Sequence, residues 1–377
     1  MMDTMGIIFS NIYDSNMGKL TGVRTAASIP FGGRYRQIDF ILSDMANSGI
    51  RNIGIITKYN YQSLMDHLGT CEEWDLKLGE GVRFLPPYAT SHTGAYHGKI
   101  EALQTALPIL ERCMSDYVVL ADSTVLCSID FTEVVRQHVA SGADVTVIAK
   151  SGIANGKDEQ KFAISLDENG KVSDLAMDYM APKGYLVGMS MFIMSREKLI
   201  DVIHELVPHG KYHFERDFLM EYYNQGKITV NVYPFSDVAM FNNDVEAYFR
   251  NSMTLLEEPV RRSLFRGNIP IYTKVRDAVP TSFGKNGKAP NCLIADGCQI
   301  NGKAEHSIIF REVTIDEGAQ VKDSIIMQGA KIGTGAKLQY VILDKNVTIE
   351  PGVCLLGSPD HPQVISKNAH ISKGAEQ

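Results

Sequence analysis

The apolar positions along this chain follow two different periods, and the change comes near residue 291. Before it, short apolar runs alternate with segments whose apolar residues recur every three or four positions, which predicts strands alternating with amphipathic helices. Such alternation indicates an α/β domain with a mostly parallel sheet covered on both faces, and ligands at the carboxyl ends of its strands. The predicted strands are 5–9, 52–57, 117–121, 144–149 and 228–233, and the predicted helices are 37–47, 61–68, 99–112, 131–141 and 214–225.

After residue 291 the pattern becomes one of short strands separated by Gly and Asp turns. Aliphatic residues recur at spacings of 6, 15, 6, 11, 6 and 11, and a small or medium apolar residue comes two positions before each. This imperfect hexapeptide repeat predicts a left-handed parallel β-helix of about three sides per coil, with the small residues turning the corners. The aliphatic positions are Ile294, Ile300, Ile315, Val321, Ile332, Leu338 and Ile349.

The two patterns divide the chain into domains. Its 377 residues are enough for two domains with ample cores. The intervening stretch carries Pro259, Pro270, Pro280 and Pro290, which is typical of a linker. We therefore expect an α/β domain over 1–250, a linker over 251–290 and a β-helix over 291–377.

Composition narrows the functional class. With 21% charged residues and a net charge of −7, the chain has the features neither of a disordered segment nor of a nucleic-acid binder. No apolar run approaches the ~20 residues that cross a membrane, and no signal-peptide pattern opens the chain, so we expect a cytoplasmic protein. The six cysteines are scattered, with no Cys-x-x-Cys pair, and are expected to be reduced and mostly buried.

One segment is far more specific than the rest. Residues 29–40 read Ile-Pro-Phe-Gly-Gly-Arg-Tyr-Arg-Gln-Ile-Asp-Phe, and 47–50 read Asn-Ser-Gly-Ile. Together with Tyr96-x-Gly98, the Glu-Ala-Tyr at 246–248 and the Asp-Ser-Ile-Ile-Met at 323–327, they closely resemble the bacterial glucose-1-phosphate adenylyltransferases over nearly the whole chain. The resemblance implies a Rossmann-like nucleotidyltransferase domain. It also implies a reaction in which glucose 1-phosphate attacks the α-phosphorus of ATP, with Mg²⁺ and basic side chains neutralising charge.

The metal ligands of that family are only half kept. Members use two aspartates, of which the first is matched by Asp122 and the second by Phe241. An aromatic ring cannot ligate a hard cation. Asp244 lies three positions later and is expected to point elsewhere. Asp122 is therefore either a relic of the metal site or simply the acidic end of a strand.

The phosphate-binding parts also depart from the family. Its Gly-rich turn is replaced by Ser-Asn-Ile-Tyr-Asp-Ser-Asn-Met-Gly at 10–18, where bulky side chains and Asp14 disfavour a triphosphate. A lysine expected near the phosphates is Ala26. Two further family residues are missing here. Tyr88 stands where the family has a glutamine beside the base, and no residue of 175–180 matches its sugar-phosphate lysine.

A relic of the ligand pocket is expected at the start of the helix near residue 99. Where the family has a small hydroxyl side chain, this sequence has Lys99. The residues expected to line the relic pocket are Tyr96, Gly98, Lys99, Glu101 and Asp122.

These departures resemble the GlgD-type subunit of the enzyme, which implies a chain that is inactive or nearly so alone and raises the activity of a GlgC-type catalytic partner in glycogen biosynthesis. A heterotetramer is expected, with Mg²⁺ bound only by the partner, and whether the isolated chain forms a homo-oligomer is left open. Arg34 and Arg36 either contact a sugar-phosphate effector or simply order the loop before their helix.

Other readings stay open at this point. The chain remains an active nucleotidyltransferase if a remodelled loop binds the phosphates. The repeat alone is also compatible with an acyltransferase that uses His306 as a base, although a structural role for His306 is favoured. A metal cluster of His204, His209 and His213 is disfavoured, because His204 and His209 do not share the i, i+4 face of a helix and His209 stands in a predicted Pro-His-Gly turn.

Overall fold

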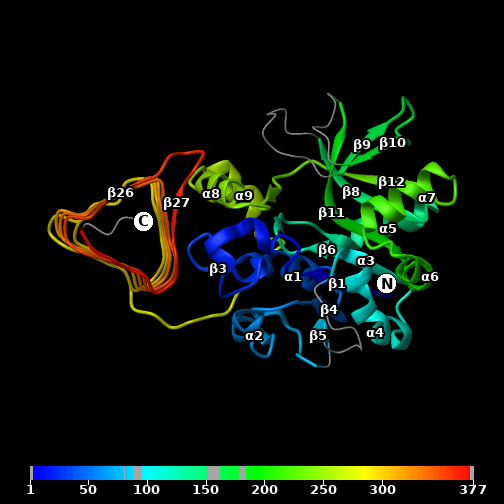
Figure 1. Ribbon diagram of the computed structural model, residues 1–377, viewed down its shortest axis with the longest axis horizontal. Coiled ribbons are helices and arrows are strands. Elements are labelled where there is room, and N and C mark those ends of the chain that lie inside the picture. The colour runs from blue at the N-terminus through cyan, green and yellow to red at the C-terminus, as the bar shows by residue number, and fades with distance from the viewer. Residues whose placement is uncertain (1–2, 80, 88–95, 152–161, 178–183, 374–377) are drawn as a thin grey trace.

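The computed structural model describes residues 3–79, 81–87, 96–151, 162–177 and 184–373. It has the two predicted halves, an α/β domain and a β-helix (Figure 1). Among the described residues, none of the helices combines the length and the apolar character needed to cross a membrane. All six cysteines are free thiols, and of these Cys71, Cys127 and Cys298 are buried.

A nine-stranded sheet forms the centre of the first half. Its parallel part joins β1 to β4 and β6, and β4 to β5, and in that register Phe9 lies beside Asp122. The predicted mostly parallel sheet is confirmed, but β11 was not predicted and runs antiparallel to both β6 and β8. The strands are β1 (Thr4–Phe9), β4 (Ile53–Ile56), β5 (Val82–Leu85), β6 (Tyr117–Asp122), β8 (Val145–Ser151), β9 (Phe162–Leu166), β10 (Val172–Met177), β11 (Leu186–Ser195) and β12 (Val230–Phe235).

Helices cover both faces of this sheet. Neighbouring Ile7 and Ile8 of β1 point into separate apolar cores, as the alternation of side chains along a strand requires. The predicted helix 99–112 is interrupted by a 3-10 turn, Gln104–Ala106, and the predicted helix 214–225 begins as a π-helix, Phe214–Met220. The α-helices are α1 (Gln37–Asn47), α2 (Gln62–Leu68), α3 (Lys99–Leu103), α4 (Leu107–Arg112), α5 (Phe131–Ser141), α6 (Arg196–Leu206) and α7 (Glu221–Asn224).

The second half is a parallel β-helix, consistent with the left-handed type predicted from the hexapeptide repeat. Figure 1 shows its stacked coils as a triangle. One sheet comprises β14 (Ser282–Phe283), β16 (Gln299–Ile300), β19 (Thr314–Ile315), β22 (Lys331–Ile332), β25 (Thr348–Ile349) and β28 (His370–Ile371). The second comprises β15 (Leu293–Ile294), β18 (Ile308–Ile309), β21 (Ile325–Ile326), β24 (Val341–Leu343) and β27 (Gln363–Ile365). The third comprises β17 (Lys303–Glu305), β20 (Gln320–Lys322), β23 (Lys337–Gln339) and β26 (Cys354–Leu356).

The corners of the coils explain the repeat. Ile315 pairs with Ile332, which pairs with Ile349, so predicted aliphatic positions stack on one another in the core. The prediction that the small residues turn the corners is wrong, because they lie just after the corners and, except for half-buried Cys292, are buried. Each follows a residue of positive φ, which glycine and asparagine adopt at low cost, as Gly329 does before Ala330 and Asn346 before Val347.

The segment 251–290 packs against both halves. The helix α8 (Val245–Thr254) runs across its start, α9 (Glu258–Leu264) follows, and β14 already belongs to the β-helix. In Figure 1, α8 and α9 lie between the sheet domain and the β-helix. One apolar core includes Phe31 of the first half, Leu255 of this segment and Ile325 of the β-helix. The two halves therefore share a buried interface.

Candidate functional site

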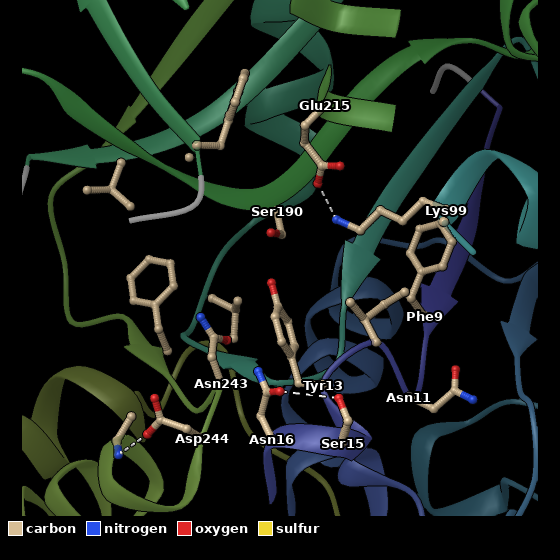
Figure 2. Close-up of a pocket in the computed structure, with 18 of the residues that line it drawn as sticks. Phe9, Asn11, Tyr13, Ser15, Asn16, Lys99, Ser190, Glu215, Asn243 and Asp244 are labelled. Carbon is tan, nitrogen blue, oxygen red and sulfur yellow. Dashed lines mark hydrogen bonds and ion pairs between the residues drawn. The ribbon is translucent and has the colours of Figure 1, made fainter. Parts of the chain in front are cut away.

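A cavity of about 980 Å³ opens where the predicted ligand site lies, at the carboxyl ends of β1 and β6. Phe9 ends β1, Lys99 begins α3 and Ser190 comes from β11, so residues far apart in the sequence meet there (Figure 2). The cavity reaches α8, and Asn251 lines that side.

The carboxylate expected to be a metal-site relic is paired with a lysine. Asp122 ends β6 and is 1% exposed, and its Oδ2 lies 3.2 Å from Nζ of Lys99. The same ammonium forms an ion pair with Glu215, toward which it points in Figure 2. Burial raises the pKa of Asp122 to about 6, although Lys99 opposes that shift. Burial works to lower the pKa of Lys99, but the carboxylates of Asp122 and Glu215 together hold it above its ordinary value, so the ammonium stays charged.

The position of the missing metal ligand lies at the same edge. Phe241 belongs to β13 (Met240–Phe241), which pairs with β7 (Val125–Leu126), shortly after Asp122 along the chain. Its ring lines the cavity. Asp244 accepts a hydrogen bond of 2.6 Å from the backbone N–H of Ala247, so its carboxylate caps the start of α8.

These residues do not fit a divalent metal ion. Phe241 stands at the position where the family has its second carboxylate, and a phenyl ring cannot ligate a metal ion. The Lys99 ammonium beside Asp122 repels any added cation. No group of three or more His, Cys, Asp or Glu suited to a metal occurs in the part of the chain that the structure describes.

The segment at 10–18, which stands in place of the family's Gly-rich turn, folds back on itself. Residues Asp14–Thr21 form a 3-10 helix with a kink at Gly18, and the Thr21 hydroxyl donates to the Asp14 carbonyl over 2.7 Å. Tyr13 precedes this helix, and only 7% of its surface is exposed. In Figure 2 its ring stands in the cavity with the hydroxyl toward Ser190. An aromatic ring thus fills space at the position of the family's Gly-rich turn.

Two of the predicted departures contact each other. Oδ1 of Asp14 accepts a hydrogen bond of 2.7 Å from the backbone N–H of Ala26. Burial raises the pKa of Asp14 to about 7, while this hydrogen bond and nearby Lys58 oppose the rise. The Asp14 carboxyl group therefore ties the loop to the segment that carries Ala26.

The predicted relic pocket forms only in part. Tyr96, Gly98 and Lys99 line the cavity, whereas Glu101 turns back to accept hydrogen bonds from the backbone and ring of His97. Asp122 is paired with Lys99 and is not among the lining residues. A Cβ added to Gly98 would meet the carbonyl group of Tyr212, 2.6 Å from its carbon, so Gly98 has a packing reason independent of any ligand. Tyr88 and residues 178–180 lie outside the described residues.

Arg34 and Arg36 lie elsewhere, in a hollow of about 40 Å³ at the junction of the two halves. We call this the basic hollow, and its cationic residues are Arg34, Arg36, Lys274, Arg276, Arg311 and Lys345. Arg36 donates a hydrogen bond of 2.5 Å to the carbonyl of Ser63, a contact that helps to order its own segment. Burial lowers the pKa of Arg36 to about 10. Burial, with help from Arg36 and Arg24, lowers the pKa of Lys345 to about 7.

The histidines singled out by the sequence stay apart. His204 lies 3.8 Å from Glu111, His209 bonds to the carbonyl of Glu205, and only His213 lines the large cavity. His306 has φ of 46° at a corner of the β-helix, where its Nδ1 lies 2.7 Å from Asp323. This supports a structural position for His306.

Sequence reasoning missed several residues of these sites. Glu215 is 116 positions from Lys99, so no local pattern connects them. Arg311 and Lys345 belong to the β-helix, and their distance from Arg36 along the chain hid the basic hollow. A signal was available beside Lys345, because Asp344 stands where the two preceding coils carry the apolar residues Met327 and Phe310.

Comparisons with known proteins agree with this architecture. Residues 16–236 match the family described as nucleotidyl transferase, and 277–374 match the GlmU-like C-terminal hexapeptide family. The glycogen biosynthesis protein GlgD of Bacillus subtilis (strain 168) is 32% identical over 364 residues, covering 96% of this chain and 95% of that protein. GlgD of Geobacillus stearothermophilus is 35% identical over 319 residues, covering 84% and 82%. The glucose-1-phosphate adenylyltransferase of Bacillus mycoides (strain KBAB4) is 30% identical over 345 residues, covering 90% and 91%.

Fold, domain order and sequence similarity over nearly the whole chain lead to one assignment: the chain belongs to the family of glucose-1-phosphate adenylyltransferases and GlgD glycogen biosynthesis proteins.

Proposed function

We propose that this chain is a non-catalytic or weakly catalytic regulatory subunit of ADP-glucose pyrophosphorylase, acting in the cytoplasm. In this role it joins a GlgC-type catalytic subunit in a hetero-oligomer and raises the partner's rate of ADP-glucose synthesis. The observation that carries the proposal is the Lys99 ammonium beside Asp122, in a cavity where Phe241 stands in place of the second carboxylate.

The changed residues support loss of catalysis because each would weaken the same transition state. Transfer to phosphorus depends on positioning and on positive charge around the phosphates. Here Tyr13 fills space beside the phosphate loop, Asp14 adds a carboxyl group, and Ala26 supplies no charge. Loss of one such cation commonly costs ~10³-fold in rate, so several losses together leave little activity.

The shared interface between the two halves supports a regulatory role. A subunit influences its neighbour only through contacts that differ between two states of the assembly. The basic hollow lies at the joint between sheet domain and β-helix, where an anion would contact both. We propose that it receives a sugar-phosphate effector, with Arg34 and Arg36 from one half and Arg311 and Lys345 from the other.

A second reading, an active nucleotidyltransferase with a remodelled phosphate loop, draws its support from the cavity of about 980 Å³ that the chain retains. Lys99 would then supply positive charge. This reading requires that the chain alone make a nucleotide sugar, and that Lys99→Met abolish the activity.

Co-expression tests the proposal. The chain and an active GlgC-type subunit from the same host are co-expressed with different affinity tags, purified through both tags, and assayed with ATP, glucose 1-phosphate and Mg²⁺. We expect co-purification and a kcat, per catalytic subunit, several-fold above that of the catalytic subunit alone. No co-purification, or an unchanged kcat and effector response, would contradict the proposal.

A further inference from the structure

The buried lysine of the large cavity, Lys99, is held in place by the residues around it. Lys99 is 6% exposed, and its chain passes the rings of Phe9 and Phe192, whose centroids lie 5.7 and 5.4 Å from its Nζ. Apolar rings around the stem and carboxylates at the tip hold the ammonium in one place. The charge is therefore fixed by the fold.

The ammonium occupies the position where a cation would meet Asp122. Its Nζ is 3.2 Å from Asp122 and is ion-paired with Glu215. An ammonium has three donors; one is hydrogen-bonded to Glu215 and the contact with Asp122 is an ion pair, which leaves a donor for another acceptor. In Figure 2 the hydroxyls of Tyr13 and Ser190 face the same space.

The remainder of the cavity favours an anion. Its described lining residues include the cations Lys58, Lys150, Arg216 and Arg250 besides Lys99, against the carboxylates of Glu215, Asp244 and Asp360. Asp122 and Glu215 share the charge of Lys99, Arg216 is paired with Asp217, and Asp244 caps α8. Lys58 and Lys150 add positive charge elsewhere on the cavity lining, which suits a ligand that carries phosphate.

We propose that Lys99 serves as a fixed internal cation beside Asp122, so that this cavity binds a phosphate ester without a divalent metal ion. The ester is a nucleotide or a sugar phosphate, because both present the same phosphate oxygens. The inference rests on the proposed function, since a site released from catalysis can exchange its metal for a lysine and still bind ligand. The affinity of this cavity for the ligand would then be the same in the presence and in the absence of Mg²⁺.

Calorimetry on the purified full chain tests this. ATP and glucose 1-phosphate are titrated separately, once with EDTA and once with Mg²⁺. We expect at least one of them to bind, with dissociation constants that agree within about threefold between the two conditions. Binding only of ATP would identify the nucleotide as the ligand, and binding only of glucose 1-phosphate would identify the sugar phosphate. Binding that requires Mg²⁺, or no binding of either compound, would overturn the proposal.

A second measurement addresses the metal directly. Mn²⁺ is added to the wild-type chain and to Asp122→Asn, and bound Mn²⁺ is counted by electron paramagnetic resonance. We expect no site that depends on Asp122. A site present in the wild type and lost in Asp122→Asn would overturn the proposal.

A variant then tests Lys99 itself. Lys99→Met is combined with Glu215→Gln, so that fewer buried charges lose their partner, and Lys19→Met serves as the control because Lys19 is exposed. We expect affinity to fall about tenfold or more in the double variant, the usual scale for a charged hydrogen bond. The control should bind as the wild type, and unchanged affinity in a folded double variant would count against Lys99.

The calorimetry uses the wild-type chain and needs no variant to fold. It is done on the chain alone without turnover, so its failure is distinguishable from failure of the regulatory role, which is measured as turnover in the mixed oligomer.

Discussion

Arg24 and Asp344 form an ion pair across the junction of the two halves, with 2.9 Å between Nη1 of Arg24 and Oδ1 of Asp344. Both side chains are almost fully buried, at 2% and 1% exposure. Arg24 comes from the segment before the Phe-Gly-Gly motif, and Asp344 directly follows β24 of the β-helix. The pair lies beside the basic hollow, since Lys345 follows Asp344 directly.

We predict that Arg24→Met destabilises the chain by about 3–5 kcal/mol, because it leaves the Asp344 carboxylate buried without its partner. Chemical denaturation followed by circular dichroism measures the change. Arg51→Met is the control, since its ion pair with Asp75 is exposed and should contribute less than about 1 kcal/mol. The double variant Arg24→Met, Asp344→Leu should be more stable than Arg24→Met alone, and equal losses for Arg24→Met and Arg51→Met would contradict this account.

Lys345 should make anion binding at the basic hollow dependent on pH. Its pKa is lowered to about 7, so the fraction of protonated Lys345 rises as the pH falls through that value. Inorganic phosphate should therefore raise the melting temperature more at about pH 6 than at about pH 8, as measured by differential scanning fluorimetry. Phosphate itself gains negative charge with rising pH, which works in the opposite direction, so the sign of the result is informative.

Two variants make that measurement specific. Lys345→Met should abolish the larger phosphate effect at low pH, whereas Lys331→Met on the exposed face of β22 should leave it intact. An identical response in wild type and Lys345→Met would show that phosphate acts elsewhere.

Asp14→Asn should increase stability at neutral and higher pH. Folding raises the pKa of Asp14 from 3.8 to about 7, so between about pH 4 and pH 7 the folded chain holds a proton that the unfolded chain has released. Stability is therefore lost as the pH rises through this window, and the buried carboxylate carries its full penalty above it. Asparagine keeps the acceptor for the Ala26 N–H and has no charge to bury.

The difference in unfolding free energy between Asp14→Asn and wild type should grow by on the order of 2–4 kcal/mol from about pH 4 to pH 8. Urea denaturation at several pH values measures it, and Asp75→Asn at an exposed position is the control. A difference that stays constant with pH would mean that Asp14 is not buried in the way described.

Gly98→Ala should destabilise the start of α3 by about 1–3 kcal/mol, because the new methyl group meets the backbone of Tyr212. Gly267→Ala is the matched control, since a Cβ there meets no atom within 4 Å. Melting temperatures of the two variants provide the measurement. If both variants melt as the wild type does, the close approach of Gly98 to Tyr212 is wrong.

Most of the framework was predictable from the chain because its signals are local. α1 and α5 begin and end where the apolar pattern placed them, and the aliphatic repeat marked residues that stack in successive coils. β11 was missed because a central strand is buried on both faces, so Leu186–Ser195 shows an apolar run without a period.

The candidate site was predictable only where a single position carried the information. The sequence by itself shows that Phe241 and Ala26 stand where the family has a metal ligand and a lysine. The ion pair of Lys99 with Glu215, in contrast, joins side chains 116 positions apart. The contact of Asp14 with Ala26 was likewise hidden, because it depends on how the loop folds back. Contacts of this kind follow from tertiary packing, which no local pattern specifies.

The central claim is that this chain does not itself make ADP-glucose. The most direct measurement is ADP-glucose formation by a mixed oligomer in which the GlgC-type partner has lost its catalytic metal ligands by substitution. Beside it are assayed the intact mixed oligomer and each subunit alone. The account predicts synthesis by the intact oligomer and by the active partner, and no more than a trace by the chain alone or with the disabled partner. Sustained synthesis with the disabled partner would contradict it, because the only remaining site would be the cavity that holds Lys99, Tyr13 and Phe241.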